Sequence, residues 1–234
     1  KKIQVINLLI VSIIPFLIWG PFFPDLVVSF SVLFFLYNSF NNNNFYYFNN
    51  KPFIIFLLFL IFSVISSLEA EDISQSIKSS LFYFRIGVFS CLIWYLIEKD
   101  KSILEYFYYA LVICFSALVL DGYLQFFTGS NILGYEAGVR ISSLFGDEFI
   151  MGSYLSRLFP LLFALFLIKK KIKYEIYFIG LLFILIDVLI YISAERAAFF
   201  FLNLSTIFII ILIKDYQKFI IITFLCAFLL ILFL

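Results

Sequence analysis

Four arginines are the residues of this sequence best suited to holding an anion, and they are Arg85, Arg140, Arg157 and Arg196. A guanidinium group offers a planar fork of N–H donors that fits phosphate or carboxylate, whereas lysine is a mobile point charge. Arg157 lies about eight residues into the apolar run that begins at Phe149, roughly 12 Å along a helix. A charge at that depth is costly unless it is paired or hydrated. Two interpretations stay open for Arg157: an ion pair with Asp187 or Glu195, or a place in the wall of a polar, ligand-accessible cavity.

Acidic and polar residues recur at helical spacing close to Arg196. Asp187, Tyr191 and Glu195 follow one another every four residues, so we expect them to share one helix face. Arg196 and Asn203 are seven residues apart, which predicts a shared face on the next helix. A tight turn joins the two helices, and the N-terminus of the second adds partial positive charge near Arg196. The pattern predicts an anion seat, although Asp187 by itself is better interpreted as a buried structural partner.

The sequence contains no histidine, which excludes imidazole-based metal sites and Ser-His catalytic triads within these residues. We therefore expect no metal and no cofactor. The cysteines Cys91, Cys114 and Cys226 lie inside apolar runs, where a thiol usually serves as a small packing residue. We expect no disulfide.

The elements that must position these residues are membrane spans. The chain is 65% hydrophobic and only 13% charged, with a mean hydropathy of +1.12, far from the average of soluble domains. Its net charge of +1 argues against a nucleic-acid partner, which would require a basic face. Splitting the sequence at its charged and turn-forming clusters predicts an all-α integral membrane protein of about nine transmembrane helices, at 3–20, 25–37, 52–68, 79–97, 103–121, 149–168, 175–193, 197–213 and 218–234.

The distribution of lysine predicts the orientation of these spans. If the N-terminus is cytoplasmic, every lysine except Lys78 lies in a cytoplasmic connection or at its edge, as the positive-inside rule requires. The cluster 169–173 indicates the same side on its own. All four arginines then lie in outer loops or in the outer parts of spans. This outward arginine cluster suggests an anionic ligand on that side.

The chain reads as one polytopic membrane domain, 1–234. Its first span resembles the start of a signal peptide, but no small-residue cleavage site follows, so we predict an uncleaved span. The sequence starts without Met and ends inside an apolar run at Leu234, so we expect it to be an incomplete N-terminal portion of a longer protein.

Two connections have informative compositions. The long outer loop 122–148 is rich in Gly, Ser and Asn, which suits either contact with sugar hydroxyls or a plain solvated loop. The segment 69–80 places Ile73, Ile77 and Leu81 at four-residue spacing beside acidic residues. It predicts either a short interfacial helix or a solvated acidic loop.

Two motifs resemble the O-antigen ligase and O-antigen polymerase superfamily. The first is Arg140-Ile-Ser-Ser-Leu-Phe-Gly-Asp-Glu-Phe-Ile-Met-Gly-Ser-Tyr-Leu, followed by the helix from Pro160. The second is Ile192-Ser-Ala-Glu-Arg-Ala-Ala, which resembles the small-residue and arginine turn that opens the family's C-terminal region. One membrane hairpin separates the two motifs, as in the family. The large outer loop with further Arg and His residues, which follows in that family, is not in this sequence.

The resemblance implies a metal-independent, inverting glycosyltransferase in the bacterial inner membrane. Its donor would be an undecaprenyl-diphosphate-linked glycan used on the periplasmic side, and its acceptor a lipid or another glycan. By resemblance Arg196 engages the donor diphosphate and is the catalytic candidate. We expect substrate-binding roles for Arg140, Arg157, Glu195, Asp187 and Tyr191. Fixed arginines would stabilise the departing diphosphate without a metal, while the residue that acts as base for the acceptor hydroxyl stays open.

Two other classes of function are compatible with the residues. A transporter or lipid-linked glycan flippase would use Arg157 and Asp187 as gating or substrate-binding groups within the membrane. A non-catalytic membrane scaffold would use the same charges only to hold its helices together. The choice between ligase and polymerase, the sugar and the acceptor stay open.

Overall fold

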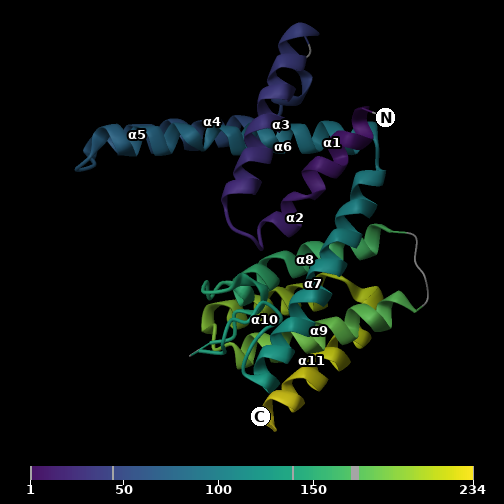
Figure 1. Ribbon diagram of the computed structural model, residues 1–234. Helices are drawn as coiled ribbons and strands as arrows, with labels where there is room; N and C mark the ends of the chain where they lie inside the picture. Colours follow the sequence, from purple (N-terminus) through teal and green to yellow (C-terminus); the bar gives the residue numbers. More distant parts are fainter. Residues whose placement is uncertain (1, 44, 139, 170–173, 234) are drawn as a thin grey trace. The chain divides into compact units, whose positions relative to one another are not determined.

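The structure is a computed structural model that describes residues 2–43, 45–138, 140–169 and 174–233. In these residues the regular elements are helices, and no β-strand is formed (Figure 1). The α-helices are α1 (Lys2–Val11), α2 (Ile13–Phe16), α3 (Phe22–Asn41), α4 (Lys51–Ser66), α5 (Ile73–Phe82), α6 (Phe84–Lys99), α7 (Ser102–Thr128), α8 (Met151–Ile168), α9 (Glu175–Ile192), α10 (Arg196–Leu212) and α11 (Gln217–Leu232).

Seven helical segments of the described chain are long and apolar enough to cross a membrane. Two of the nine expected spans fall short of that length, namely Ile3–Phe16, which Ser12 divides into α1 and α2, and Arg196–Leu212. The all-helical class and the run of apolar spans are therefore as the sequence predicts. The seven long segments are Phe22–Asn41, Lys51–Glu69, Ile73–Lys99, Ser102–Thr128, Met151–Ile168, Glu175–Ile192 and Lys214–Leu232.

The contacts of the chain gather in two compact units. The first comprises Lys1–Leu17 and Pro21–Tyr106, and the second comprises Phe107–Leu234 with Ile18–Gly20. The first holds α1 to α6 and the beginning of α7, and the second holds the rest of α7 and α8 to α11.

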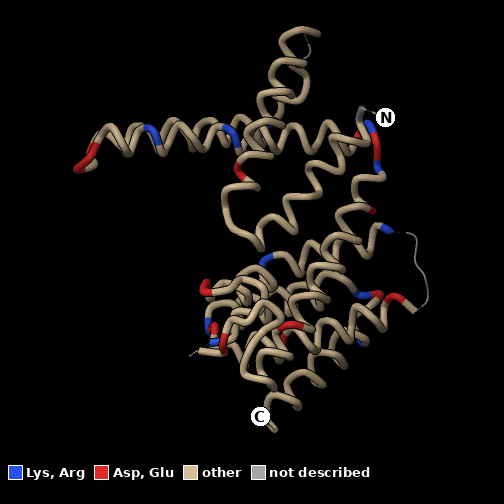
Figure 2. Tube along the Cα trace, viewed as in Figure 1, with Lys and Arg blue, Asp and Glu red and all other residues tan. Residues whose placement is uncertain are grey.

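Most Lys, Arg, Asp and Glu residues lie near helix ends and turns, and long stretches without charged residues lie between them (Figure 2). Of the lysine cluster 169–173, only Lys169 belongs to the described residues. It caps the end of α8, donates to Glu175 Oε1 at 2.7 Å, and lies 4.6 and 4.3 Å from the ring centroids of Tyr108 and Tyr109. Burial opposes the charge of Lys169, but its bonds to Glu175 and Tyr109 outweigh burial and raise its pKa.

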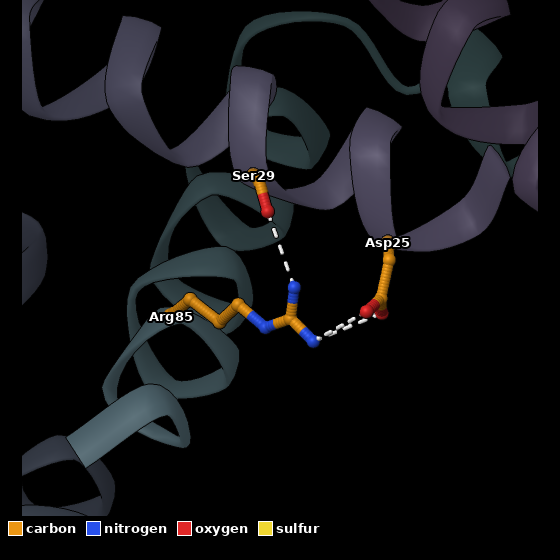
Figure 3. A network of polar contacts seen from close by, with 3 residues as sticks. All are labelled: Asp25, Ser29 and Arg85. Carbon is orange, nitrogen blue, oxygen red and sulfur yellow. Dashed lines mark hydrogen bonds and ion pairs between the residues drawn. The ribbon is translucent and has the colours of Figure 1, made fainter. Parts of the chain in front are cut away.

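In the first unit, α3 and α4 both pack on α6, and an ion pair connects α3 to α6 (Figure 3). Arg85 Nη2 donates to both carboxylate oxygens of Asp25 at 2.9 Å, and Nη1 donates to Ser29 Oγ at 3.1 Å. The guanidinium carbon also lies 3.8 Å from the ring centroid of Phe82. These contacts explain Arg85 as a structural group that holds the first turn of α3 against the first turn of α6.

The segment 69–80 before α6 is divided between the two interpretations, since its acidic residues precede a short helix. Asp72 Oδ1 accepts from Gln75 N at 2.9 Å and so caps α5, which runs from Ile73 to Phe82. Tyr83 separates α5 from α6. The expected short helix is therefore confirmed for Ile73–Phe82, while Glu71 and Asp72 lie in an exposed bend, as the loop interpretation expected.

In the second unit, α10 lies against α8, α9 and α11, and α9 also packs on α11. The largest fully buried side chains of α8 include Leu155, Leu162 and Phe166. On α7, Gly122 allows close approach to α9, since a Cβ there would lie 2.9 Å from a methyl carbon of Leu189. The packing of these helices positions the start of α8 and the α9–α10 turn, where the candidate site lies.

Helix α7 continues to Thr128, seven residues beyond its predicted end at 121. The prediction stopped there because Asp121 and Gln125 are polar, but both side chains are buried and bonded to the loop that follows. The connection to α8 is accordingly 129–150, shorter than the expected loop 122–148.

Candidate functional site

The turn between α9 and α10 forms the centre of the site. Helix α9 ends at Ile192 and α10 begins at Arg196, so only Ser193, Ala194 and Glu195 connect them. Ala194 has a positive φ of 59°, a conformation that a small side chain tolerates more readily than a branched one. The buried Ser193 Oγ donates to Ile190 O at 2.8 Å, which satisfies the hydroxyl inside the turn. The tight turn expected from the sequence is confirmed.

Glu195 is 7% exposed, and its carboxylate caps the neighbouring helix α8. One oxygen, Oε1, accepts from Gly152 N at 2.6 Å. The other, Oε2, accepts from Ser153 N at 3.0 Å and from Ser153 Oγ at 3.3 Å. The first amides of a helix lack intrahelical acceptors and carry partial positive charge. Both oxygens of Glu195 are thus engaged by protein groups, which argues against its use as the base for an acceptor hydroxyl.

Gly152 allows this approach. A Cβ at that position would lie 2.9 Å from both the carboxyl carbon and Oε1 of Glu195. No other residue type leaves room for the carboxylate at this distance from the start of α8. The amides of Gly152 and Ser153 and the hydroxyl of Ser153 therefore all donate hydrogen bonds to one carboxylate, that of Glu195 in the turn before α10.

Arg140 and Arg196 line the same cavity, which has a volume of about 550 Å³. Arg196 is the first residue of α10, and Arg140 comes from the loop between α7 and α8; both side chains are exposed. Between them the wall is built from Phe149, Ser153, Ala194, Glu195, Ala197 and Ala198. Two guanidinium groups against one capped carboxylate leave this cavity positively charged.

Tyr191 lies on the other side of the turn. It lines a second cavity of about 320 Å³ together with Ile190, Phe199 and the turn residues 194–196. Its ring meets the ring of Phe199 edge-on, with centroids 5.8 Å apart. Arg196 and Glu195 border both cavities, so the turn forms a wall between them.

Asp187 occupies the interface between α9 and α10. It is 1% exposed, and its Oδ1 accepts from Asn203 Nδ2 at 3.2 Å. Asn203 also donates to Phe199 O, one turn earlier on α10, at 2.8 Å. The expected common face holds for Asp187 and Tyr191, which are one turn apart on α9 and both contact α10, but it is wrong for Glu195, which lies beyond the end of α9, in the turn. Asp187 instead has the structural partner that its sequence position favoured.

Arg157 lies on an exposed face of α8. No ion pair joins it to Asp187 or Glu195, so that interpretation is wrong. The reason is that Glu195 binds the start of α8 and Asp187 binds Asn203. Arg157 is also absent from the residues that line the cavity of Arg140 and Arg196.

The connection 129–150 is a folded cap organised by two buried polar residues of α7. Gln125 Oε1 accepts from the backbone amides of Ser142 and Ser143 at 3.1 and 2.8 Å. Asp121 accepts from Ser143 Oγ and from Ile132 N, both at 2.9 Å. This network anchors residues 131–132 and 142–143 to α7, while 132–138, 140 and 147–150 are exposed.

Sequence reasoning missed the part that α8 plays in the site. Gly152 and Ser153 belong to the first motif, yet nothing in their types alone connects them to Glu195. The available signal was a small residue followed by a hydroxyl residue at a helix start, paired with an acid in the second motif. Phe149, which also lines the cavity, was counted only as the beginning of an apolar span.

The fold and the site together define a polytopic α-helical membrane protein with a cationic cavity at the ends of its helices. Comparison with models of protein families, with characterised proteins and with solved structures gives no match to this chain.

Proposed function

We propose that this chain transfers a glycan from an undecaprenyl-diphosphate carrier to a lipid or glycan acceptor at the periplasmic face of the bacterial inner membrane. The observation that supports the proposal best is the cavity shared by Arg140 and Arg196. The two motifs that resemble the O-antigen ligase and polymerase superfamily supply one arginine each, and the fold brings both to a single wall. A pair of guanidinium groups suits a diphosphate better than a single charge.

The chemistry requires stabilisation of negative charge as the glycosyl bond to the diphosphate breaks. Arg196 stands at the N-terminus of α10, where the partial positive charge of the helix adds to its own. Arg140 approaches from the cap over α8, and the Ser153 hydroxyl borders the same space. Donors that already stand where negative charge develops lower the reorganisation that the reaction needs. No metal is required for this role.

Orientation in the membrane is part of the proposal. The lysine distribution favours a cytoplasmic N-terminus, and if all nine predicted spans cross the membrane, the start of α8 and the α9–α10 turn face the periplasm. A carrier with a polyprenyl tail would approach from the bilayer, with its diphosphate at the level of these helix ends.

Replacement of Arg196 tests the proposal. Arg196→Ala is expected to lower glycan transfer about 10²- to 10³-fold, the usual effect of removing one preorganised charge-stabilising donor. Transfer would be measured with a polyprenyl-diphosphate-linked glycan and protein reconstituted in vesicles, after membrane insertion and thermal unfolding have been checked. Arg157→Ala is the matched control, since Arg157 is exposed and outside the cavity. Full transfer by Arg196→Ala, or an equal loss in both variants, would remove Arg196 from the mechanism.

A further inference from the structure

The connection between α7 and α8 begins with a turn of unusual composition. Gly134 N donates to Asn131 O at 3.0 Å, so Asn131–Gly134 forms a β-turn with Ile132 and Leu133 at its centre. These central positions normally hold Pro, Gly, Asn, Asp or Ser. Ile132 is 71% exposed and Leu133 is 60% exposed. Two large apolar side chains therefore project from the tip of a turn and make little contact with the protein.

Hydrogen bonds to α7 and to the later part of the connection hold this turn in place. Ile132 N donates to the buried Asp121 Oδ1 at 2.9 Å, and Asn131 Nδ2 donates to Ser143 O at 2.7 Å. Asn131 Oδ1 accepts from Tyr135 N at 2.8 Å. These bonds satisfy the polar groups at the base of the turn and prevent Ile132 and Leu133 from folding back onto the unit.

The turn continues an apolar surface on α7. The residues of that helix most exposed toward its end are apolar, namely Ile113, Leu120, Leu124 and Phe127, at a spacing that repeats along one helix face. From Phe126 to Tyr135 the sequence contains no charged residue. Phe127 is 78% exposed at the last turn of the helix. The exposed apolar residues of α7 are thus followed, after the four uncharged residues 128–131, by the two exposed apolar residues of the turn.

We propose that the turn Asn131–Gly134 docks into the membrane surface, with Ile132 and Leu133 inserted at the boundary between lipid headgroups and acyl chains. Moving the side chains of Ile132 and Leu133 out of water into an apolar environment is favourable. The exposed carbonyl groups of the turn limit insertion to this boundary, because they need water or headgroups as hydrogen-bond donors. The aromatic side chains beside the turn are typical of this depth. The partner is a lipid surface, and the inference does not depend on glycan transfer.

Depth-dependent fluorescence quenching tests the docking. Leu133→Trp would be introduced into a chain whose own tryptophans are replaced, Trp19→Phe and Trp94→Phe, and reconstituted in phosphatidylcholine vesicles. The expected result is a blue-shifted emission that loses most of its intensity with lipids brominated near the headgroup and less with lipids brominated near the chain end. Asp147→Trp, at an exposed acidic position of the same connection, is the control and is expected to keep its emission.

Ile132→Trp serves as a second reporter if the Leu133→Trp protein does not fold or cannot be reconstituted into vesicles. Docking is refuted if the emission of the folded reporter is unaffected by brominated lipid. A blue-shifted but unquenched reporter also refutes it, because another part of the chain or a second copy would then cover the turn. Equal quenching at Asp147→Trp refutes a specific role of the turn.

Discussion

The substitution Gly152→Ala tests the bond between Glu195 and the start of α8 most directly. In an ordinary helix Ala is more stable than Gly by about 1 kcal/mol, so this substitution would normally stabilise the protein. Here the new Cβ would lie 2.9 Å from the carboxyl group of Glu195. The carboxylate must move, and its hydrogen bonds to Gly152 N, Ser153 N and Ser153 Oγ are weakened or broken.

The expected cost follows from those bonds. Leaving a buried backbone amide without its partner costs about 1–3 kcal/mol, and two amides of α8 are affected. Water entering from the adjacent cavity offsets part of this, so a loss of roughly 2–4 kcal/mol is expected before the helix preference of Ala is counted. Subtracting about 1 kcal/mol for that preference leaves a net destabilisation of about 1–3 kcal/mol. The sign is opposite to the ordinary effect of the substitution.

A double-mutant cycle isolates the contact. With Glu195→Ala in place the Cβ has room, and Gly152→Ala is expected to be neutral or stabilising. Denaturant unfolding of the protein in detergent micelles would give the four stabilities. Gly138→Ala is a size-matched control, because a Cβ there meets no atom within 4 Å. If Gly152→Ala is as stable as the unchanged chain, or destabilises equally with and without Glu195, the carboxylate does not hold the start of α8.

Three further substitutions test polar contacts that we interpret as structural. Arg85→Ala is expected to change the unfolding free energy by no more than about 1 kcal/mol, since its partner Asp25 is largely exposed, and to leave glycan transfer intact; loss of transfer would contradict a structural role. Asn203→Leu is expected to cost about 1.5–3 kcal/mol by removing the amide donor of buried Asp187, and adding Asp187→Leu should restore most of it; an additive second loss would argue against the pair. Burial, helped by a bond to Glu98, raises the pKa of Tyr47 from 10.0 to about 12, so its contribution to stability is complete below pH 10 and declines as the pH rises toward 12. The stability difference from Tyr47→Phe should shrink over that interval, and a constant difference would refute the shift.

The helices were largely predictable from the sequence, because each is an apolar run bounded by charged or turn-forming residues. The end of α7 was not. Asp121 and Gln125 were interpreted as the beginning of a loop, since polar residues usually end a span. The helix continues past them because the loop folds back, and its amides and a hydroxyl donate hydrogen bonds to the Asp121 and Gln125 side chains. Such a partner arises from tertiary structure and leaves no local periodic signal.

The candidate site was predictable only in part. The residue types of Arg140 and Arg196, and the motifs around them, indicated an anion site, and the fold gives both a place in one cavity. The partner of Glu195, the start of α8, was not predictable from the sequence. An acid beside an arginine suggests an ion pair or a catalytic base, whereas the Glu195 carboxylate accepts hydrogen bonds from backbone amides. Arg157 was expected to be paired or to line a cavity because of its depth in an apolar run. Its helix instead presents it on an exposed face, which periodicity alone did not reveal.

The hydrogen bonds of the site also imply an order of assembly as the chain leaves the ribosome. The bonds from α7 to its loop join residues 11 to 22 positions apart, so α7 can organise the loop as soon as the loop emerges. The start of α8 must wait for Glu195, 43 residues later, after a complete membrane hairpin has been synthesised. Until Glu195 has been synthesised and has reached α8, the amides of Gly152 and Ser153 lack this carboxylate as their hydrogen-bond acceptor. The cavity of Arg140 and Arg196 thus comes into existence late in biogenesis, and a chain interrupted before α10 would carry an open helix end where the site should be.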